Sequence, residues 1–396
     1  MRIKTMAGNG RDKTFCEFFA GIGLVREGLE PSGWSCGYAN DIDPKKRQAY
    51  EARFGPSEHF HLGDVGETDE VARRVPGRPF LATASFPCID LSVAGHYRGL
   101  VDGSHSSTFF GFAKLLDALG DRKPPVVMVE NVPGFLTSRC GEDFALAARR
   151  LADLGYWLDA IVLDACHFTP QSRPRVFVFG VAAELRPEEC VPPGRLWPSD
   201  DVSVLRPRRI QAFKAKLTLA TGWMTLPLPP PPRRVQRLSD VIDTDDGQPW
   251  WGDSDVRRHS EMMSDLHRRR VEEIVQSGER WVGTIFRRIR EHTQRAEVRF
   301  DGLAGCLRTP KGGSAKQIVI AADRGVQRMR RMTPTEYARL QGTPDYPLVG
   351  TTIQQLWGFA DAVCVPAIRW IDRYVLTPIY QSAYLRSRAA LEPTGV

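Results

Sequence analysis

Residues 18–24 read Phe-Phe-Ala-Gly-Ile-Gly-Leu and lie between an apolar run, Thr14–Phe19, and a helix-like stretch, Leu24–Leu29. Glycines at such a point let the backbone turn tightly from a strand into a helix and approach a ligand closely. Asp41 follows about twenty residues later, where a carboxylate can bind ribose hydroxyls. The pattern predicts an α/β sheet that binds a nucleoside-containing cofactor, although an ordinary strand–helix turn has the same glycines.

Short apolar runs alternate with helix-like stretches through the first half of the chain. We expect strands at Thr14–Phe19, Ser35–Ala39, Leu81–Ser85, Val126–Glu130, Trp157–Leu163 and Arg175–Gly180. We expect helices at Leu24–Leu29, Pro44–Phe54, Ser107–Leu119 and Glu142–Leu154. This alternation favours an open, mostly parallel sheet with helices on both faces, and ligands bind such sheets at the carboxyl ends of strands.

The alternation ends near residue 183, where a segment rich in proline and arginine begins. The net charge is +7, and residues 206–300 hold 19 Lys and Arg against 13 Asp and Glu. This surplus suits a polyanionic partner, although a solvated arginine-rich face has the same composition. Further elements are expected at Asp255–Gln276, Arg280–Arg290, Gln317–Ala321, Thr333–Leu340 and Val363–Tyr374, the last an apolar helix that returns to the first domain.

The composition argues against several classes of protein. No run of about eighteen apolar residues is present, so no membrane span is expected. Residues 1–13 do not resemble a secretory signal. The eight cysteines form no CxxC pair, so neither a metal site nor a disulfide framework is expected. A cytoplasmic protein fits these observations.

Chemically reactive side chains follow three of the expected strands. Cys88 follows Pro87, and a thiol becomes a good nucleophile once a nearby arginine or helix N-terminus lowers its pKa. Glu130 ends an apolar run, where a half-buried carboxyl can donate or share a proton. Arg173 and Arg175 alternate, so both guanidiniums point to one face. A thiol, a carboxylate and two guanidiniums at neighbouring strand ends suit covalent chemistry on an electron-poor heterocycle.

Each of these residues also has an ordinary interpretation. Cys88 could be a buried, inert thiol, Glu130 a surface ion-pair partner, and the two arginines plain surface charge. Cys88 differs from the other cysteines because a polar, glycine-bearing loop, Asp90–His105, follows it.

Taken in order, these motifs resemble those of the cytosine-C5 DNA methyltransferase family. The resemblance covers about residues 1–183 and 300–375 and includes Gln171–Arg175, Arg331–Gly342 and Gly358–Val363. It implies a Rossmann-like, mostly parallel sheet of the class I methyltransferase type with a smaller, irregular target-recognition domain. The implied parts are a catalytic and cofactor-binding domain (1–184), a target-recognition domain (185–345), and a hinge with a C-terminal helix (346–396).

The resemblance also implies a reaction, methyl transfer from S-adenosylmethionine to C5 of a cytosine flipped out of duplex DNA. Cys88 would attack the base, Glu130 would bind its N3, Arg173 would hold its carbonyl and Arg175 would help to fix Glu130. The cofactor residues would be Phe19, Ala20, Gly21, Ile22, Gly23, Leu24, Asp41, Ile42, Asp64, Val65, Pro87, Asp361 and Ala362. The DNA contacts would be Ser92, Gln171, Arg308, Thr309 and Lys311.

The chain departs from the family pattern at Leu24, Ile42, Ile89, Cys306 and Asp361, where the family usually has Gly, an aromatic residue, Gln, Thr and Asn. We expect a monomer that acts on double-stranded DNA in the bacterial cytoplasm, at the nucleoid, beside a restriction or phage-defence system. The motifs leave three alternatives open: the same chemistry on tRNA, a catalytically idle DNA-binding regulator, and a nicotinamide dehydrogenase if only the glycine loop is considered.

Overall fold

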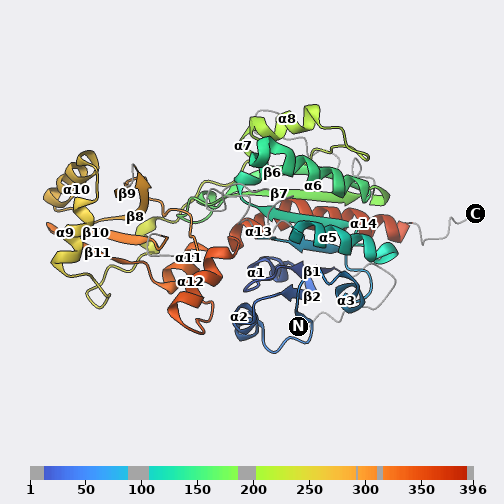
Figure 1. Ribbon diagram of the computed structural model, residues 1–396, viewed down its shortest axis with the longest axis horizontal. Coiled ribbons are helices and arrows are strands. Elements are labelled where there is room, and N and C mark those ends of the chain that lie inside the picture. Colours follow the sequence, from blue (N-terminus) through green and yellow to red (C-terminus); the bar gives the residue numbers. More distant parts are fainter. Residues whose placement is uncertain (1–12, 88–106, 186–201, 291–292, 310–314, 390–396) are drawn as a thin grey trace, which may run out of the picture.

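Two β-sheets organise the protein (Figure 1). The computed structural model describes residues 13–87, 107–185, 202–290, 293–309 and 315–389. The larger sheet has seven strands in the order β3-β2-β1-β4-β5-β7-β6. Its strands are β1 (Thr14–Phe18), β2 (Ser35–Asp41), β3 (Phe60–Leu62), β4 (Leu81–Ala84), β5 (Val126–Asn131), β6 (Tyr156–Asp164) and β7 (Pro174–Ala182).

The larger sheet is mostly parallel, as predicted. Strands β3, β2, β1, β4 and β5 pair in parallel, whereas β7 runs antiparallel to both β5 and β6. The smaller sheet is antiparallel, in the order β11-β10-β8-β9. Its strands are β8 (Trp281–Arg290), β9 (Thr293–Arg299), β10 (Ile318–Asp323) and β11 (Val326–Arg331). The smaller domain, expected to be irregular, therefore contains a regular sheet.

Helices flank both sheets. In the first half they are α1 (Leu24–Leu29), α2 (Pro44–Phe54), α3 (Thr68–Arg74), α5 (Ser107–Ala118) and α6 (Glu142–Asp153). In the second half they are α7 (Val202–Leu205), α8 (Arg208–Lys216), α9 (Asp253–Glu261), α10 (Asp265–Ser277), α11 (Pro334–Leu340), α12 (Thr352–Asp361), α13 (Val365–Ile371) and α14 (Thr377–Ala389). Figure 1 shows α9 and α10 beside the smaller sheet, with α11 and α12 between the two sheets. Within the described ranges, no helix is long and apolar enough to cross a membrane.

The central strands are apolar because both faces of the larger sheet are covered. All six residues of β5 are buried. Val126 and Met128 pack into one core, and Val127 and Val129 pack into the core on the other face, since successive side chains of a strand point to opposite sides. The sheet edge formed by the strand ends is therefore fixed by packing on both sides.

Segments distant in sequence complete the larger domain. Helix α13 packs on α1, and the indole nitrogen of Trp34 donates a buried 2.7 Å hydrogen bond to Asp372, which follows α13. Residues 202–228 lie against β6, where the buried carboxylate of Asp159 accepts hydrogen bonds from Arg206 and Lys214. The first part of the segment expected to read DNA thus packs on the larger sheet.

Candidate functional site

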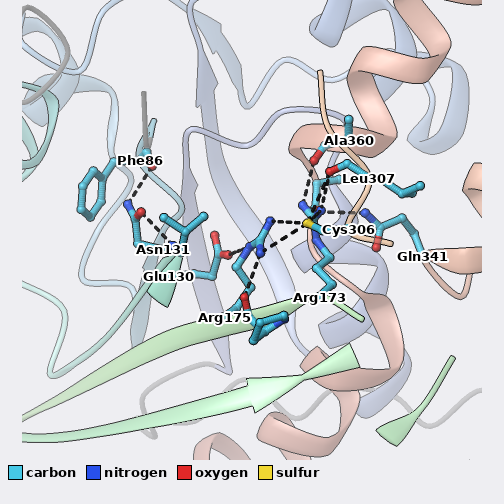
Figure 2. Close-up of polar contacts among 12 residues, drawn as sticks. Phe86, Glu130, Asn131, Arg173, Arg175, Cys306, Leu307, Gln341 and Ala360 are labelled. Atoms are coloured by element: carbon cyan, nitrogen blue, oxygen red, sulfur yellow. Dashed lines mark hydrogen bonds and ion pairs between the residues drawn. The ribbon is translucent and has the colours of Figure 1, made fainter. Parts of the chain in front are cut away.

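The carboxyl end of β5 and the start of β7 place a carboxylate against a guanidinium. Glu130 is the second-last residue of β5, and Arg175 is the second residue of β7. The Nε of Arg175 lies 3.0 Å from Oε1 of Glu130, and both side chains are largely buried (Figure 2). Because β7 runs antiparallel to β5, its first residues lie beside the last residues of β5. This pairing holds the carboxyl of Glu130 in a fixed orientation.

Asn131 ties the chain after β4 to the same strand end. Its Nδ2 donates a 3.1 Å hydrogen bond to the carbonyl of Phe86, and its Oδ1 accepts one from the amide of Val132. The ring of Phe86 packs against Phe109 and Phe135. Pro87, next in the chain, is exposed. Cys88 and Ser92 lie outside the described residues.

Arg173 is buried and contacts backbone carbonyls rather than Glu130. It is 2% exposed, and its guanidinium donates hydrogen bonds to the carbonyls of Leu307 (3.1 Å), Ala360 (2.8 Å) and Ala362 (2.6 Å). Burial and the nearby charge of Arg175 lower its pKa below the ordinary arginine value. The residue expected to hold the base carbonyl is therefore directed toward the backbone, and Arg175 is the arginine in contact with Glu130.

Cys306 lies beside both arginines (Figure 2). Its Sγ is 3.4 Å from Nη1 of Arg173 and 3.8 Å from Nη2 of Arg175. Burial acts to raise the pKa of the Cys306 thiol, but the charges of Arg175 and Arg173 outweigh it and leave this pKa below its ordinary value. In the turn that follows, Arg308 is exposed and Thr309 is half-buried, whereas Lys311 lies outside the described residues.

The glycine loop after β1 has a backbone that few residues adopt. Phe19, Gly21 and Gly23 have positive φ angles of 56°, 58° and 79°. A Cβ on Gly23 would lie 2.5 Å from the ring of Phe54, whereas a Cβ on Gly21 would meet no atom within 4 Å. Gly23 is thus required for packing, and Gly21 leaves open space on its side of the loop. A strained non-glycine residue in such a loop is typical of a ligand site.

Asp41 shapes this loop from the end of β2. Its Oδ2 accepts a 2.8 Å hydrogen bond from the amide of Gly21, and its Oδ1 accepts one from the amide of Asp43. The next residue, Ile42, is 67% exposed, although it follows a buried strand end. A buried carboxylate beside an exposed aliphatic side chain fits a ribose with an attached planar base.

The other described residues expected at the cofactor differ in burial. Ala20, Ile22 and Leu24 are buried, and so is Val65. Asp64 is exposed, and its carboxylate accepts a 2.8 Å hydrogen bond from the amide of Gly66.

Lys46 of α2 forms an ion pair with Asp361 at the end of α12. Lys46 Nζ lies 3.1 Å from Oδ2 of Asp361. Burial acts to lower the pKa of Lys46, but the carboxylates of Asp361 and Asp41 outweigh it and raise this pKa above its ordinary value. Sequence reasoning missed Lys46. A signal was present, because a lysine in the first turn of a helix is disfavoured by the helix dipole and needs a compensating acid.

Two further residues that sequence reasoning missed hold the site together. The hydroxyl of Tyr346 donates a 2.6 Å hydrogen bond to the carbonyl of Ile22 in the glycine loop. The side-chain Nε2 of Gln341 donates a 3.1 Å hydrogen bond to the carbonyl of Ala362. Both come from beyond residue 340, so no local pattern connects them to the loop.

Gln171, expected to contact DNA, is fully buried. Its Nε2 donates a 3.0 Å hydrogen bond to the carbonyl of Leu340, and its Oε1 accepts one from the amide of Leu307. In this structure, the side chain therefore bridges two backbone segments.

Comparisons with known proteins identify the family of the chain. The family model described as C-5 cytosine-specific DNA methylase matches residues 13–376. Over 42% of this chain, the sequence is 31% identical to the type II methyltransferase M.MspI of Moraxella sp. Over 41% of this chain, it is 32% identical to the type II methyltransferase M.HhaI of Haemophilus parahaemolyticus. These matches span 38% and 47% of the two relatives, less than half of each. M.HaeII of Haemophilus aegyptius is 26% identical over 90% of both chains.

Solved structures share the fold. The S. pombe Dnmt2 methyltransferase aligns with a TM-score of 0.56 at 16% identity, over 92% of this chain and 98% of that one. A putative DNA modification methyltransferase encoded within an E. coli prophage aligns with a TM-score of 0.54 at 17% identity, over 94% and 99%. The family model covers nearly the whole chain, and the chain therefore belongs to the C-5 cytosine-specific DNA methylase family.

Proposed function

We propose that this protein is a DNA (cytosine-5-)-methyltransferase that transfers a methyl group from S-adenosylmethionine to C5 of a cytosine within a specific duplex DNA site. The observation that carries the proposal is the buried Glu130–Arg175 pair at the carboxyl edge of the sheet, on the strand next to the one that leads into Pro87 and Cys88. Type II methyltransferases among the relatives support DNA as the substrate.

The reaction must make C5 of cytosine, a poor nucleophile, electron-rich. The thiolate of Cys88 attacks C6 and forms a C–S bond, and electrons move toward C5. Glu130 hydrogen-bonds or protonates N3 and so accommodates the charge that develops on the ring. S-adenosylmethionine would supply an electrophilic methyl group to C5, with cleavage of its S–CH3 bond and release of S-adenosylhomocysteine. Loss of the C5 proton and of the Cys88 thiolate then restores the aromatic ring.

Arg175 is better placed than Arg173 to contact the base. Its Nε contacts Glu130, so its guanidinium lies beside the carboxyl that would bind N3 of the same ring. The donors of Arg173 are directed to three backbone carbonyls. We therefore assign the base carbonyl to Arg175 and a supporting role to Arg173.

The cofactor fits the cradle around Gly21. The open side of Gly21, the exposed Ile42 and the buried Asp41 suit the methionine part, the adenine and the ribose. Asp64, Val65, Pro87, Asp361 and Ala362 complete the set of residues that would hold it. Asp361, which stands where the family has Asn, is neutralised by Lys46 and so adds little net charge to the cradle.

DNA must lie across the strand ends, because a base inside a duplex cannot reach Glu130 without flipping. Ser92, Arg308, Thr309 and Lys311 are the proposed contacts, and Arg308 is exposed in the turn after Cys306. Cys306 takes the place of a threonine, and a thiol held by two arginines is a poor partner for a phosphate. Arg308 is the side chain in this turn best suited to replace it. The type II relatives also support a role in a restriction–modification system.

Methylation of tRNA is the competing function, and one experiment separates the two. The protein is incubated with S-adenosylmethionine carrying an isotopically labelled methyl group and with either unmethylated DNA or tRNA, and the nucleosides are analysed by mass spectrometry. We expect labelled 5-methyldeoxycytidine from DNA and none with Cys88→Ala. Label found only in tRNA would establish the competing function, and label in neither would indicate a regulator. Bisulfite sequencing of the methylated DNA maps the recognition site.

A further inference from the structure

Arg173 joins two segments that lie more than fifty residues apart in the chain. Nη2 donates to the carbonyls of Ala360 and Ala362, and Nη1 donates to the carbonyl of Leu307 and to Sγ of Cys306. Figure 2 shows Cys306, Leu307 and Ala360 grouped near the end of the Arg173 side chain. One planar group thus contacts the turn before Arg308 and the end of α12 at the same time.

A buried cation is an expensive way to join two backbone segments. Among the described residues, the hydrogen-bond partners of Arg173 are neutral carbonyls and a sulfur atom, and no carboxylate is among them. Its Nε is buried without a partner in the described chain. Burying charge without a contacting counter-charge is unfavourable. A neutral side chain would hold a purely structural contact at lower cost.

Neighbouring polar side chains extend the connection. Gln171 accepts a hydrogen bond from the amide of Leu307, and it lies 3.4 Å from Gln341. Gln341 in turn donates to the carbonyl of Ala362, the same oxygen that Arg173 contacts. The turn at Leu307 and the segment at Ala362 are thereby linked by two buried routes.

Under the proposed function, on which this inference rests, the two segments serve different ligands. Asp361 and Ala362 belong to the cofactor cradle, and Arg308 and Thr309 belong to the DNA-contacting turn. We propose that Arg173 is a positioning residue that couples the binding of cofactor to the binding of DNA. When cofactor orders the 360–362 segment, the rigid guanidinium fork fixes the turn at 306–308 in its DNA-binding position. The coupling must be reciprocal, so DNA tightens cofactor binding by the same factor.

Isothermal titration of S-adenosylhomocysteine tests this directly, with and without a saturating DNA duplex that carries the mapped site. In the wild type, DNA should tighten the Kd for S-adenosylhomocysteine by a factor within the usual range of about 5–150. Arg173→Lys keeps the charge, but its single nitrogen cannot span both segments. In this variant, DNA should tighten the Kd for S-adenosylhomocysteine by about twofold or less, well below that range. The Kd for S-adenosylhomocysteine measured without DNA should change by a smaller factor than this ratio does.

Arg206→Lys is the matched control. Arg206 is also 2% exposed, and it contacts the buried Asp159 beside β6, away from both ligands. It should keep the wild-type coupling factor. The inference would be overturned if Arg173→Lys kept the wild-type coupling factor, if the control lost as much of it, or if the wild type showed no coupling.

A second measurement uses the wild type alone, in case Arg173→Lys does not fold. S-adenosylhomocysteine should slow backbone hydrogen exchange at residues 303–308, and unchanged exchange there would also contradict the inference. The proposed function is assayed separately by methyl transfer to DNA. If the wild type methylates DNA but shows no coupling, only the inference about Arg173 is contradicted. If the wild type transfers no methyl group to DNA, both the proposed function and the inference about Arg173 are contradicted.

Discussion

Under the proposed function, the chemistry depends most on Glu130 and Arg175 within the described part of the site. The carboxyl is largely buried, and its orientation is set by one guanidinium at 3.0 Å. Sequence alone predicted that Glu130 would lie at a strand end, because an apolar run leads into it. It could not assign the two arginines, since the partners of Arg173 lie at residues 306–307 and 360–362, which no local pattern connects to β7.

Glu130→Gln should lower the single-turnover rate of methyl transfer much more than it weakens DNA binding. General acid–base groups contribute about 10²–10⁴-fold in rate, and glutamine preserves the shape of the side chain. We expect a loss in this range in the single-turnover rate, with the DNA Kd changed by about threefold or less. Glu142→Gln, at the exposed start of α6, is the control and should keep the wild-type rate. A drop of about tenfold or less for Glu130→Gln would give Glu130 a structural role.

Glu17, next to the cofactor loop, should make the stability of the protein depend on pH. Burial raises the pKa of Glu17 to about 8 from an ordinary value of 4.5. Between these values the folded state holds a proton that the unfolded state has released. The free energy of unfolding therefore falls as pH rises through this window, by up to about 1.4 kcal/mol per pH unit.

Urea unfolding of the wild type and of Glu17→Gln at several pH values between 5 and 9 checks this prediction. Glutamine cannot ionise, so the variant should gain stability relative to the wild type as pH rises toward 8 and gain no more above it. Parallel pH profiles for the two proteins would show that Glu17 does not titrate in this window.

At the scale of single elements, strands with a clear apolar pattern were predicted within one or two residues. β1, β4, β5 and β7 are examples. β3 was missed because it has three residues, of which one is buried. β11 was missed because arginines conceal its alternation, even though Arg330 is fully buried. The expected helix at 255–276 is divided into α9 and α10, because Ser264 caps a new helix N-terminus.

Arg330 explains how a charged strand can hold the smaller domain to α11. Its guanidinium contacts the carboxylate of Glu336, and both side chains are fully buried. Arg330→Met leaves the carboxylate buried without its partner and should cost about 3–5 kcal/mol in the free energy of unfolding. Arg328→Met, on the same strand but in an exposed pair with Asp246, should cost about 1 kcal/mol or less. Urea unfolding of both variants measures the difference, and equal costs would contradict it.

At the scale of the whole molecule, the larger sheet carries Glu130 and Arg175, and the smaller sheet lies to one side of it (Figure 1). The basic composition of residues 206–300 predicted a nucleic-acid partner. It did not predict that residues 202–228 would pack on β6, because the contact depends on the buried Asp159 in a distant strand.

This division refines the expectation that residues 185–345 form the target-recognition domain. Exchange of residues 229–300 for the equivalent segment of a related enzyme should change the methylated site. Exchange of residues 202–228 should lower the stability of the protein but leave the methylated DNA site unchanged, because this part packs on the larger sheet. Bisulfite sequencing and thermal denaturation of both chimaeras check the prediction. An active 229–300 chimaera that keeps the original site would place specificity elsewhere.

Under the proposed function, the reaction proceeds through a covalent bond between Cys88 and cytosine. The most direct measurement uses duplex DNA that carries 5-fluorocytosine at the mapped site, in the presence of S-adenosylmethionine. Fluorine at C5 prevents the final elimination, so the wild type should form an adduct that survives denaturing electrophoresis and contains one methyl group. Cys88→Ala should form none. The covalent bond between Cys88 and cytosine would be contradicted if an active wild type formed no adduct, or if Cys88→Ala formed an equal amount.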